Sequence, residues 1–249
     1  MPLRRQLDDT HRPWPLPARP WVMVQRWHDL LFGHWPLNEP STRERLERLL
    51  PAGLDLDTFD DQAWIGVVPF RMSGVRLRLT PSVRGLSAFP ELNVRTYVRH
   101  RDKPGVFFFS LDAGQLAAVL IARAWFQLPY FQARMKQQGS AYSSQRRVPA
   151  QPVIGLQAHY GPVGTPFLAQ PGSLVYWLTE RYCLYTTDAA GRLACGEIHH
   201  APWLLQAAWA DITYNTMTLP LGLDVPAVEP LLHFARFQQV LVWPLQRVA

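Results

Sequence analysis

The stretch that decides the fold reads Glu91-Leu92-Asn93-Val94-Arg95-Thr96-Tyr97-Val98. Its residues alternate in character with a period of two, which is the period of a β-strand and not of an α-helix. One face of this strand therefore carries a row of hydrogen-bonding groups, namely Glu91, Asn93, Arg95 and Tyr97. In an ordinary antiparallel sheet such a row faces water, but in a sheet that curls into a cone it lines an internal cavity.

The same period continues on both sides of this stretch, and turn residues separate the segments. The predicted strands are 54–59, 62–71, 75–80, 92–99, 106–112, 140–147, 152–160, 167–170, 181–187, 192–199, 205–214, 231–237 and 240–243. Helical spacing predicts helices over 22–31, 41–50, 116–126 and 173–179, with a capping box at Ser41–Glu44 and a cap at Ser173. Gly161 to Gly164 is typical of a turn. The sequence thus predicts an α+β protein built on a mainly antiparallel, curved and partly closed sheet.

The length and composition favour one large domain. Residues 1–20 contain five prolines and no apolar periodicity, which predicts a flexible Pro/Arg-rich arm, and residues 21–249 form the domain. The sequence has neither an apolar run of about 18 residues nor a signal peptide, so we expect a cytoplasmic protein with no membrane contact. Two cysteines are too few for a disulfide framework or a cysteine metal cage.

Positive charge is concentrated in one part of the chain. The formal net charge is +6, and residues 71–103 hold seven arginines and one lysine against Glu91 and Asp102. This segment is either a solvated basic surface or a site for a carboxylate or phosphate. We expect no nucleic-acid partner, because no recognisable nucleic-acid-binding motif is present.

Two further groups of residues could carry chemistry. A hairpin turn centred between Ala189 and Ala190 would place Tyr182 opposite Glu197 and Glu180 opposite His199, which makes a carboxylate–histidine pair for acid–base chemistry. A register shift of one residue would destroy this pair, and Glu180 could instead belong to the preceding helix. Arg123 is either a two-pronged clamp for a carboxylate or an ordinary exposed arginine. Neighbouring histidines on a strand point to opposite faces, so we predict no metal site, and no cofactor motif is visible.

Five blocks of sequence together resemble the YqjF-like family of uncharacterised bacterial proteins, in the acetoacetate decarboxylase-like superfamily. The blocks are residues 64–70, 89–97, 123–130, 179–182 and 196–200. The resemblance runs from about Trp21 to Trp243 and implies a β-cone or barrel with a closed interior cavity and a few peripheral helices.

The resemblance also shows which enzyme residues have changed. The lysine that forms an imine with substrate in the decarboxylases falls on Tyr130, its neighbouring lysine on Phe131, and the catalytic glutamate near Asn93. A phenol cannot form an imine with a ketone. The chain has only two lysines, Lys103 and Lys136, and neither lies in a motif that would bury and activate it. We therefore expect no decarboxylation through a lysine imine.

Three functional hypotheses remain. The first is an enzyme without imine chemistry, acting on a small acidic or carbonyl-containing metabolite. In it Arg95 or Arg123 holds an anion, assisted by the polar residues Asn93, Tyr97, Glu180 and Tyr182, while Tyr130 donates to a carbonyl and Glu91 or the Glu197 and His199 region moves a proton. The second is a protein that binds such a ligand without turnover, and the third is a structural or interaction module. A homodimer is the default for any oligomer of this kind.

Overall fold

The computed structural model describes residues 8–147, 152–188, 190–224 and 228–248. In this part of the chain the strands are β1 (Met23–Leu37), β2 (Asp55–Leu56), β3 (Ala63–Leu77), β4 (Phe89–His100), β5 (Lys103–Ala113), β6 (Tyr130–Gln138), β7 (Ala141–Arg146), β8 (Gly155–Leu168), β9 (Cys183–Thr187), β10 (Leu193–His199), β11 (Leu204–Asn215), β12 (Leu231–Val242) and β13 (Gln246–Arg247). The helices are α1 (Pro40–Leu49), α2 (Leu116–Phe126), α3 (Leu174–Thr179) and a 3-10 turn, η2 (Leu219–Leu221).

All these strands belong to one mixed sheet, in the order β13-β10-β9-β5-β6-β7-β8-β11-β12-β1-β3-β4-β2. Neighbours are antiparallel except for β5, which runs parallel to β6 and β9. β5 also pairs with β4, and β10 with β12, so the sheet bends back on itself. The structure confirms the α+β class and the mainly antiparallel sheet, whereas the closed cone or barrel stays a prediction.

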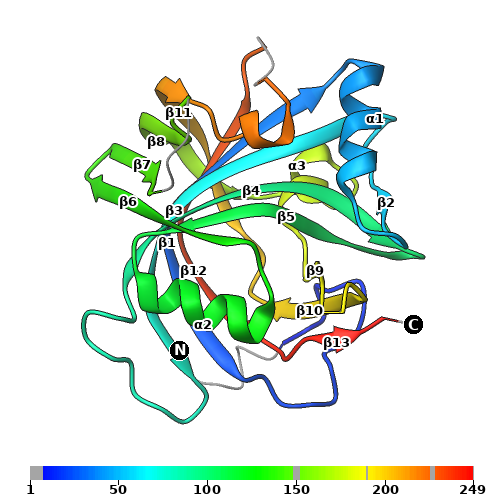
Figure 1. The fold of residues 1–249 in the computed structure, drawn as a ribbon, viewed down its shortest axis with the longest axis vertical. Coiled ribbons are helices and arrows are strands. Elements are labelled where there is room, and N and C mark those ends of the chain that lie inside the picture. Colours follow the sequence, from blue (N-terminus) through cyan, green and yellow to red (C-terminus); the bar gives the residue numbers. More distant parts are fainter. Residues whose placement is uncertain (1–7, 148–151, 189, 225–227, 249) are drawn as a thin grey trace.

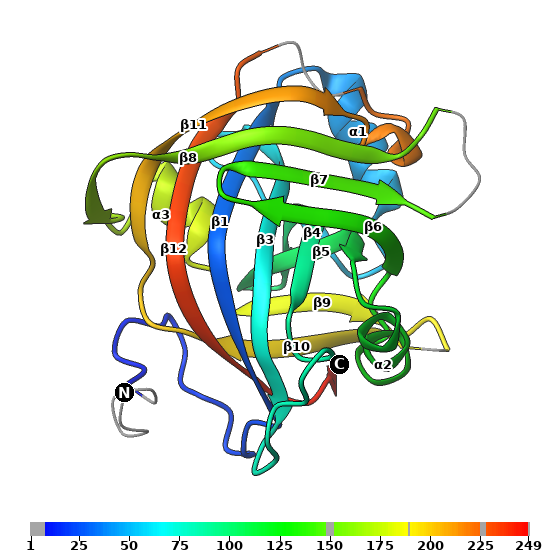
Figure 2. The same cartoon turned by 90° about the vertical axis from the view of Figure 1, so that its left-hand side faces the viewer.

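The long strands and the helices have a simple spatial arrangement. β8, β11, β12, β1 and β3 wrap around one side of the molecule, and α1 and α2 lie toward opposite ends of its long axis (Figures 1 and 2). α2 connects β5 to its parallel neighbour β6, as a parallel pair requires a crossover. This crossover places α2 beside β5 and β6.

The helix predicted over 22–31 is wrong, because these residues belong to strand β1. The register between β1 and β3 shifts between His28 and Gly33, and Asp29 in this interval has a φ of 50°. Such a bulge inserts an extra residue and resets the alternation of side chains. The apolar residues on either side of it therefore fall at an apparently helical spacing.

Several other sequence predictions need correction. Segments 62–71 and 75–80 form the single strand β3, 152–160 and 167–170 form β8, and 231–237 and 240–243 form β12. Gly161 to Gly164 lies inside β8 and not in a turn. β6 was missed, because its sequence is mostly polar. α1 begins at Pro40 with Glu39 at its N-cap and no side-chain cap, so the capping box at Ser41 is wrong.

Other elements agree with the sequence. α2 spans the predicted residues, and Ser173 caps α3 by accepting a hydrogen bond from the backbone N–H of Tyr176 at 3.2 Å. The hairpin of β9 and β10 is present, but Glu197 pairs with Cys183 and not with Tyr182. The predicted register is thus wrong by one residue, which is enough to turn each side chain to the other face.

The described part of the predicted arm, residues 8–20, lies against β9 and β10. The guanidinium of Arg12 and the indole N–H of Trp14 both donate to Glu197, at 2.8 and 3.0 Å. His11 is within hydrogen-bonding distance of the carbonyl of His200, at 2.8 Å. Residues 1–7 lie outside the described residues, and the flexibility of the arm and the division into domains stay predictions.

Strand β4 is buried on both faces, which positions the functional site. Leu92 and Val94 pack into one apolar cluster with Trp35, Ile65 and Tyr142. The polar row on the opposite face is also buried and lies on the side of a second apolar cluster. Because the first face fills a core, the second must either fill another core or line a cavity.

Candidate functional site

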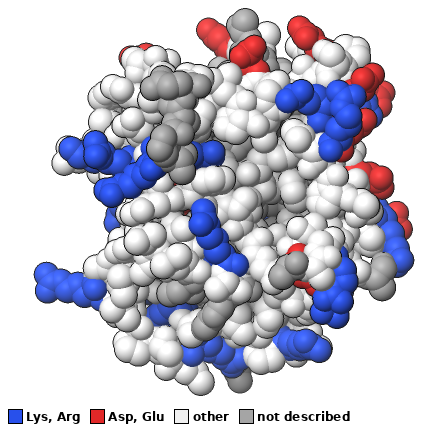
Figure 3. Space-filling model, in the orientation of Figure 1, with Lys and Arg blue, Asp and Glu red and all other residues white. Residues whose placement is uncertain are grey.

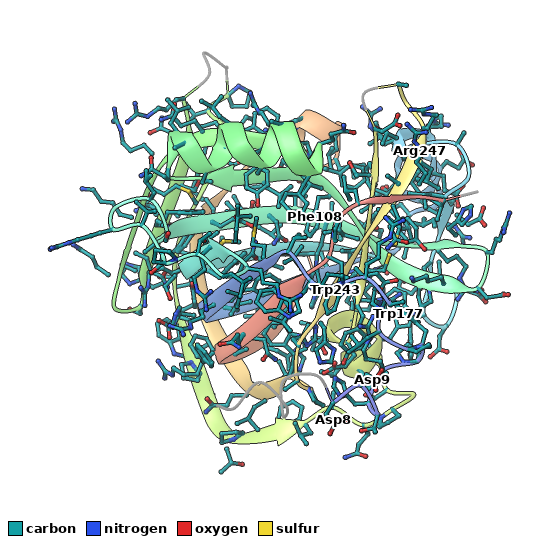
Figure 4. The ribbon with its side chains drawn as sticks, turned by 90° about the horizontal axis from the view of Figure 1, so that it is seen from below. Asp8, Asp9, Phe108, Trp177, Trp243 and Arg247 are labelled. Atoms are coloured by element: carbon teal, nitrogen blue, oxygen red, sulfur yellow. The ribbon has the colours of Figure 1, made fainter. Side chains whose placement is uncertain are left out.

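A cavity of about 420 Å³ lies between the sheet, α2 and the loop that joins β3 to β4. Its wall is mainly apolar and includes Phe32, Phe70, Phe108, Leu111, Leu128 and Trp203. Seen from below, Phe108 lies near the middle of the molecule, whereas Asp8 and Asp9 of the arm lie toward its edge (Figure 4). Exposed residues such as Val83 and Leu86 also line the cavity, so it reaches the surface beside this loop.

The polar row of β4 supplies the polar part of this wall. Glu91, Asn93 and Arg95 all line the cavity, as their shared strand face requires. Tyr97 continues the row but lies behind the wall, where its hydroxyl is 2.7 Å from His34 Nε2 and donates to the carbonyl of Leu178 at 3.0 Å. The structure therefore places the polar face of β4 toward the cavity and not toward solvent.

Glu91 is held as a neutral acid. It is almost fully buried, and burial raises its pKa to about 8, although the hydroxyl of Tyr130 donates to its Oε2 at 3.0 Å and partly opposes this rise. The buried carboxyl of Asp112 adds to the increase. At neutral pH Glu91 therefore keeps its proton and can donate a hydrogen bond into the cavity.

Tyr130 is fixed at the start of β6 by the backbone around it. Tyr130 pairs with Leu111 of the parallel strand β5, and the Nε of Arg123 donates a hydrogen bond of 2.6 Å to the backbone carbonyl of Tyr130. Burial, and after it the proximity of Glu91, raise the pKa of the Tyr130 phenol well above its ordinary value. Tyr130 is thus a permanent donor, and Arg123 is an exposed residue that positions β6 and does not line the cavity. The clamp predicted at Arg123 has no support from this placement.

Arg95 carries a buried positive charge on the wall of the cavity. The residue is 9% exposed, its Nε has no hydrogen-bond partner, and its Nη2 donates a long hydrogen bond of 3.5 Å to the carbonyl of Leu178. In the described residues no carboxylate lies within ion-pair distance of it, although its guanidinium lies over the rings of Phe32 and Tyr97. The Oδ1 of Asn93 also lacks a partner. Buried charges and buried polar atoms are normally paired, so the lack of such partners at Arg95 and Asn93 is unusual.

The second predicted group, Glu180, Tyr182, Glu197 and His199, lies next to the cavity and not in it. Glu180 accepts from the hydroxyl of Tyr182 and from the backbone N–H of Trp203. Glu197 accepts from the arm residues and forms an ion pair with Lys103. His199 pairs with Leu241 of β12, so the predicted carboxylate–histidine pair with Glu180 is absent from the strand register.

The sequence reasoning missed several residues of the wall. Arg181 and His200 both line the cavity. Arg181 forms an ion pair with Asp57 at 2.8 Å, so its charge is balanced. Burial lowers the pKa of His200 to about 4, and its ring stacks on Tyr182. Trp27 also lines the cavity. It was not predicted, because residues 22–31 were assigned to a helix and the strand face that Trp27 shares with other wall residues was not recognised.

Neither lysine of the chain lines the cavity. Lys103 binds Glu197 outside it, and Lys136 is exposed on β6. The residues that the structure describes contain no group of three or more metal-ligating side chains. They also contain no helix long and apolar enough to cross a membrane.

Comparison with known proteins identifies the family and the fold. The chain is 48% identical over 231 residues to the uncharacterized protein YqjF of Bacillus subtilis (strain 168), covering 91% of this chain and 93% of that protein. An acetoacetate decarboxylase from Legionella pneumophila has the same fold with a TM-score of 0.61 and 15% identity, covering 97% of this chain and 94% of that one. The enduracididine biosynthesis enzyme MppR, solved in complex with pyruvate, has a TM-score of 0.60 and 10% sequence identity. The match covers 96% of this chain and 95% of that one. Residues 24–239 match the family model DUF2071, described as an uncharacterized conserved protein, and the chain therefore belongs to this family.

Proposed function

We propose that this protein binds a small carboxylic acid that also carries a carbonyl group and an apolar body. The observation that carries the proposal is the buried, unpaired guanidinium of Arg95 on the wall of a mainly apolar cavity. A ligand carboxylate would satisfy Arg95 through charge-assisted hydrogen bonds, and the amide of Asn93 is on the same strand face to assist it.

Glu91 would bind the carbonyl end of the ligand. Positions 91 and 95 on one strand are about 13 Å apart at their Cα atoms, and both long side chains line the cavity, so a small molecule between them would contact both. Tyr130 donates to Oε2 of Glu91, which leaves the proton of the neutral acid free to be donated from Oε1. A protonated acid in a dry cavity polarises a carbonyl and can exchange a proton with the carbon next to it.

Two observations support an acidic carbonyl ligand without imine chemistry. Tyr130 occupies the position of the imine-forming lysine in the resemblance, and both lysines lie away from the cavity. MppR, which shares the fold, is described in complex with pyruvate, a keto acid. The fold thus accommodates this class of ligand in another protein, and Arg95 and Glu91 offer both of the contacts that such a ligand needs.

The test is a thermal-shift screen of keto acids with aliphatic or aromatic bodies, with the matching amides as uncharged controls. A ligand at 100 times its dissociation constant stabilises a protein by about 2.7 kcal/mol. The variant Arg95→Met should lose this response while its unliganded melting temperature stays equal or rises, because the change removes an unpaired buried charge. Arg134→Met, at an exposed arginine of β6, should keep the response. Equal stabilisation by acids and amides, or of wild type and Arg95→Met, would refute the proposal.

A second measurement separates catalysis from binding alone. The keto acids that stabilise the protein are incubated with it in heavy water, and exchange of the protons next to the carbonyl is followed by NMR. Exchange that is lost in Glu91→Gln assigns proton transfer to Glu91. Binding without exchange assigns the cavity to sensing or sequestration of the acid.

A further inference from the structure

In the described part of the chain, the loop and the helix that border the cavity carry exposed apolar side chains. Leu79 is 93% exposed in the loop 78–88 between β3 and β4, and Leu120 is 56% exposed on α2. Val83, Leu86 and Leu116 are also exposed. We call these five residues the rim. An exposed apolar cluster next to a binding cavity is typical of an interaction site.

The two segments of the rim lie together. The side-chain amide of Gln115, at the start of α2, donates to the carbonyl of Gly85 in the loop at 2.6 Å. Val83 and Leu86 of the loop line the same cavity as Ala118 and Ala122 of α2. The loop and α2 are neighbours at the lower end of the molecule in two perpendicular views (Figures 1 and 2).

The rim is surrounded by positive charge. Residues 71–89 and 114–127, which contain it, hold five arginines and no acidic residue, namely Arg71, Arg76, Arg78, Arg84 and Arg123. In the described part of the chain Arg78 and Arg84 form no ion pair, and both are exposed. In the view of Figure 3 blue side chains are spread over the face and include its lower end, whereas red ones lie mainly along the top and the right-hand side.

We propose that the rim docks on the surface of an anionic lipid bilayer. Leu79 and Leu120 enter the boundary between headgroups and acyl chains, and Arg78 and Arg84 contact the anionic headgroups. Charge complementarity favours this partner over a second copy of the chain, because two copies would bring the exposed Arg78 and Arg84 of each together without acidic partners in the rim segments. The contact is peripheral, in keeping with the absence of a spanning helix in the described residues.

This inference goes beyond the proposed function and does not depend on it. It also departs from the sequence prediction of no membrane contact, which considered only segments long enough to span. The exposed leucines of the loop and of α2 are at least 30 residues apart in the sequence, and only the fold brings the two segments together. An apolar acid could then exchange between the bilayer and a cavity that opens at the bilayer surface.

The test is co-sedimentation of the full chain with vesicles of phosphatidylcholine, with and without one-third phosphatidylglycerol. We expect binding to the anionic vesicles that falls when salt is raised. Each basic residue near an anionic surface contributes about fivefold to binding, so Arg78→Gln/Arg84→Gln should weaken it roughly 30-fold. Leu79→Ser/Leu120→Ser should abolish it, whereas Leu204→Ser, an equally exposed leucine on β11, should not.

Melting temperatures of all variants establish that each is folded. Arg95→Met should bind vesicles as wild type does, which separates this inference from ligand binding in the cavity. Three results would overturn the inference: no binding to either vesicle, equal binding to both, or a lipid-free dimer that Leu79→Ser/Leu120→Ser dissociates. The last result would assign the rim to self-association.

Discussion

Replacing Glu91 by glutamine should abolish the fall in the free energy of unfolding that Glu91 causes between pH 6.5 and 8. Burial raises the pKa of Glu91 to about 8, while the value in the unfolded chain is the ordinary 4.5. Between these two values the folded protein holds a proton that the unfolded chain has released, so the free energy of unfolding falls as the pH rises. From pH 6.5 to 8 this difference amounts to about 1.5 kcal/mol, at 1.36 kcal/mol per unit before the curve flattens near the folded pKa.

For a chain of this length that decrease lowers the melting temperature by roughly 3–6 °C. Other groups with shifted pKa values, among them Asp112, Glu180, Cys195 and His200, contribute to the slopes of wild type and variant alike, so their contribution cancels when the two curves are subtracted. The neutral glutamine of Glu91→Gln should give a flatter curve than wild type over this range. Glu44→Gln, on the exposed face of α1, is the control and should keep the wild-type slope.

The assay is denaturant unfolding at intervals from pH 6.5 to 8.5, compared as the difference between each variant and wild type. Tyr130→Phe provides an internal check, because loss of its hydrogen bond should raise the pKa of Glu91 further and move the flattening above pH 8. Parallel curves for wild type and Glu91→Gln would show that Glu91 ionises normally in the folded protein. The neutral-acid role in the proposed function would then fail.

Three further changes test the packing that holds the site. Asp57→Asn should destabilise the protein by about 3–5 kcal/mol in denaturant unfolding, because it leaves the buried guanidinium of Arg181 without its charged partner, and an unchanged midpoint would contradict this ion pair. Gly105→Ala should lower stability by about 1–3 kcal/mol, since the added methyl would meet the ring of Tyr185 at 2.7 Å and the backbone carbonyl of Cys183 at 2.8 Å, and a neutral effect would contradict this close packing. Ser173→Ala should cost about 1 kcal/mol by removing the cap of α3, whereas Ser173→Asp should retain most of the stability.

The sequence predicted those features that depend on local chemistry. Alternation in β4 placed Glu91, Asn93 and Arg95 on one face, and the structure has them on one wall. The helical spacing of apolar residues predicted the extent of α2. These predictions succeed because the period of side chains acts within a few residues.

The failures come from interactions between distant segments. The bulge near Asp29 is stabilised by two neighbouring strands, and its effect on the period of β1 imitates a helix. The register of β9 on β10 differs by one residue from the symmetric hairpin, which moved Glu197 away from Tyr182. The contacts of Arg12 and Trp14 with Glu197 join segments more than 180 residues apart, and no local pattern could indicate them.

The change of a lysine to Tyr130 alters the electrostatics of the cavity as well as its chemistry. A lysine next to Glu91 would stabilise the ionised carboxylate and lower its pKa, but a phenol only donates a hydrogen bond, and burial remains the larger effect. Glu91 is therefore neutral, His200 is neutral because its pKa is about 4, and Asp57 balances the charge of Arg181. Among the described residues of the wall, Arg95 is then the buried charge without an ionic partner, while the half-buried Arg76 also lines the cavity. A buried site with an excess of one positive charge is matched best by a ligand with one negative charge, so a monocarboxylate should bind more tightly than a dicarboxylate of the same length.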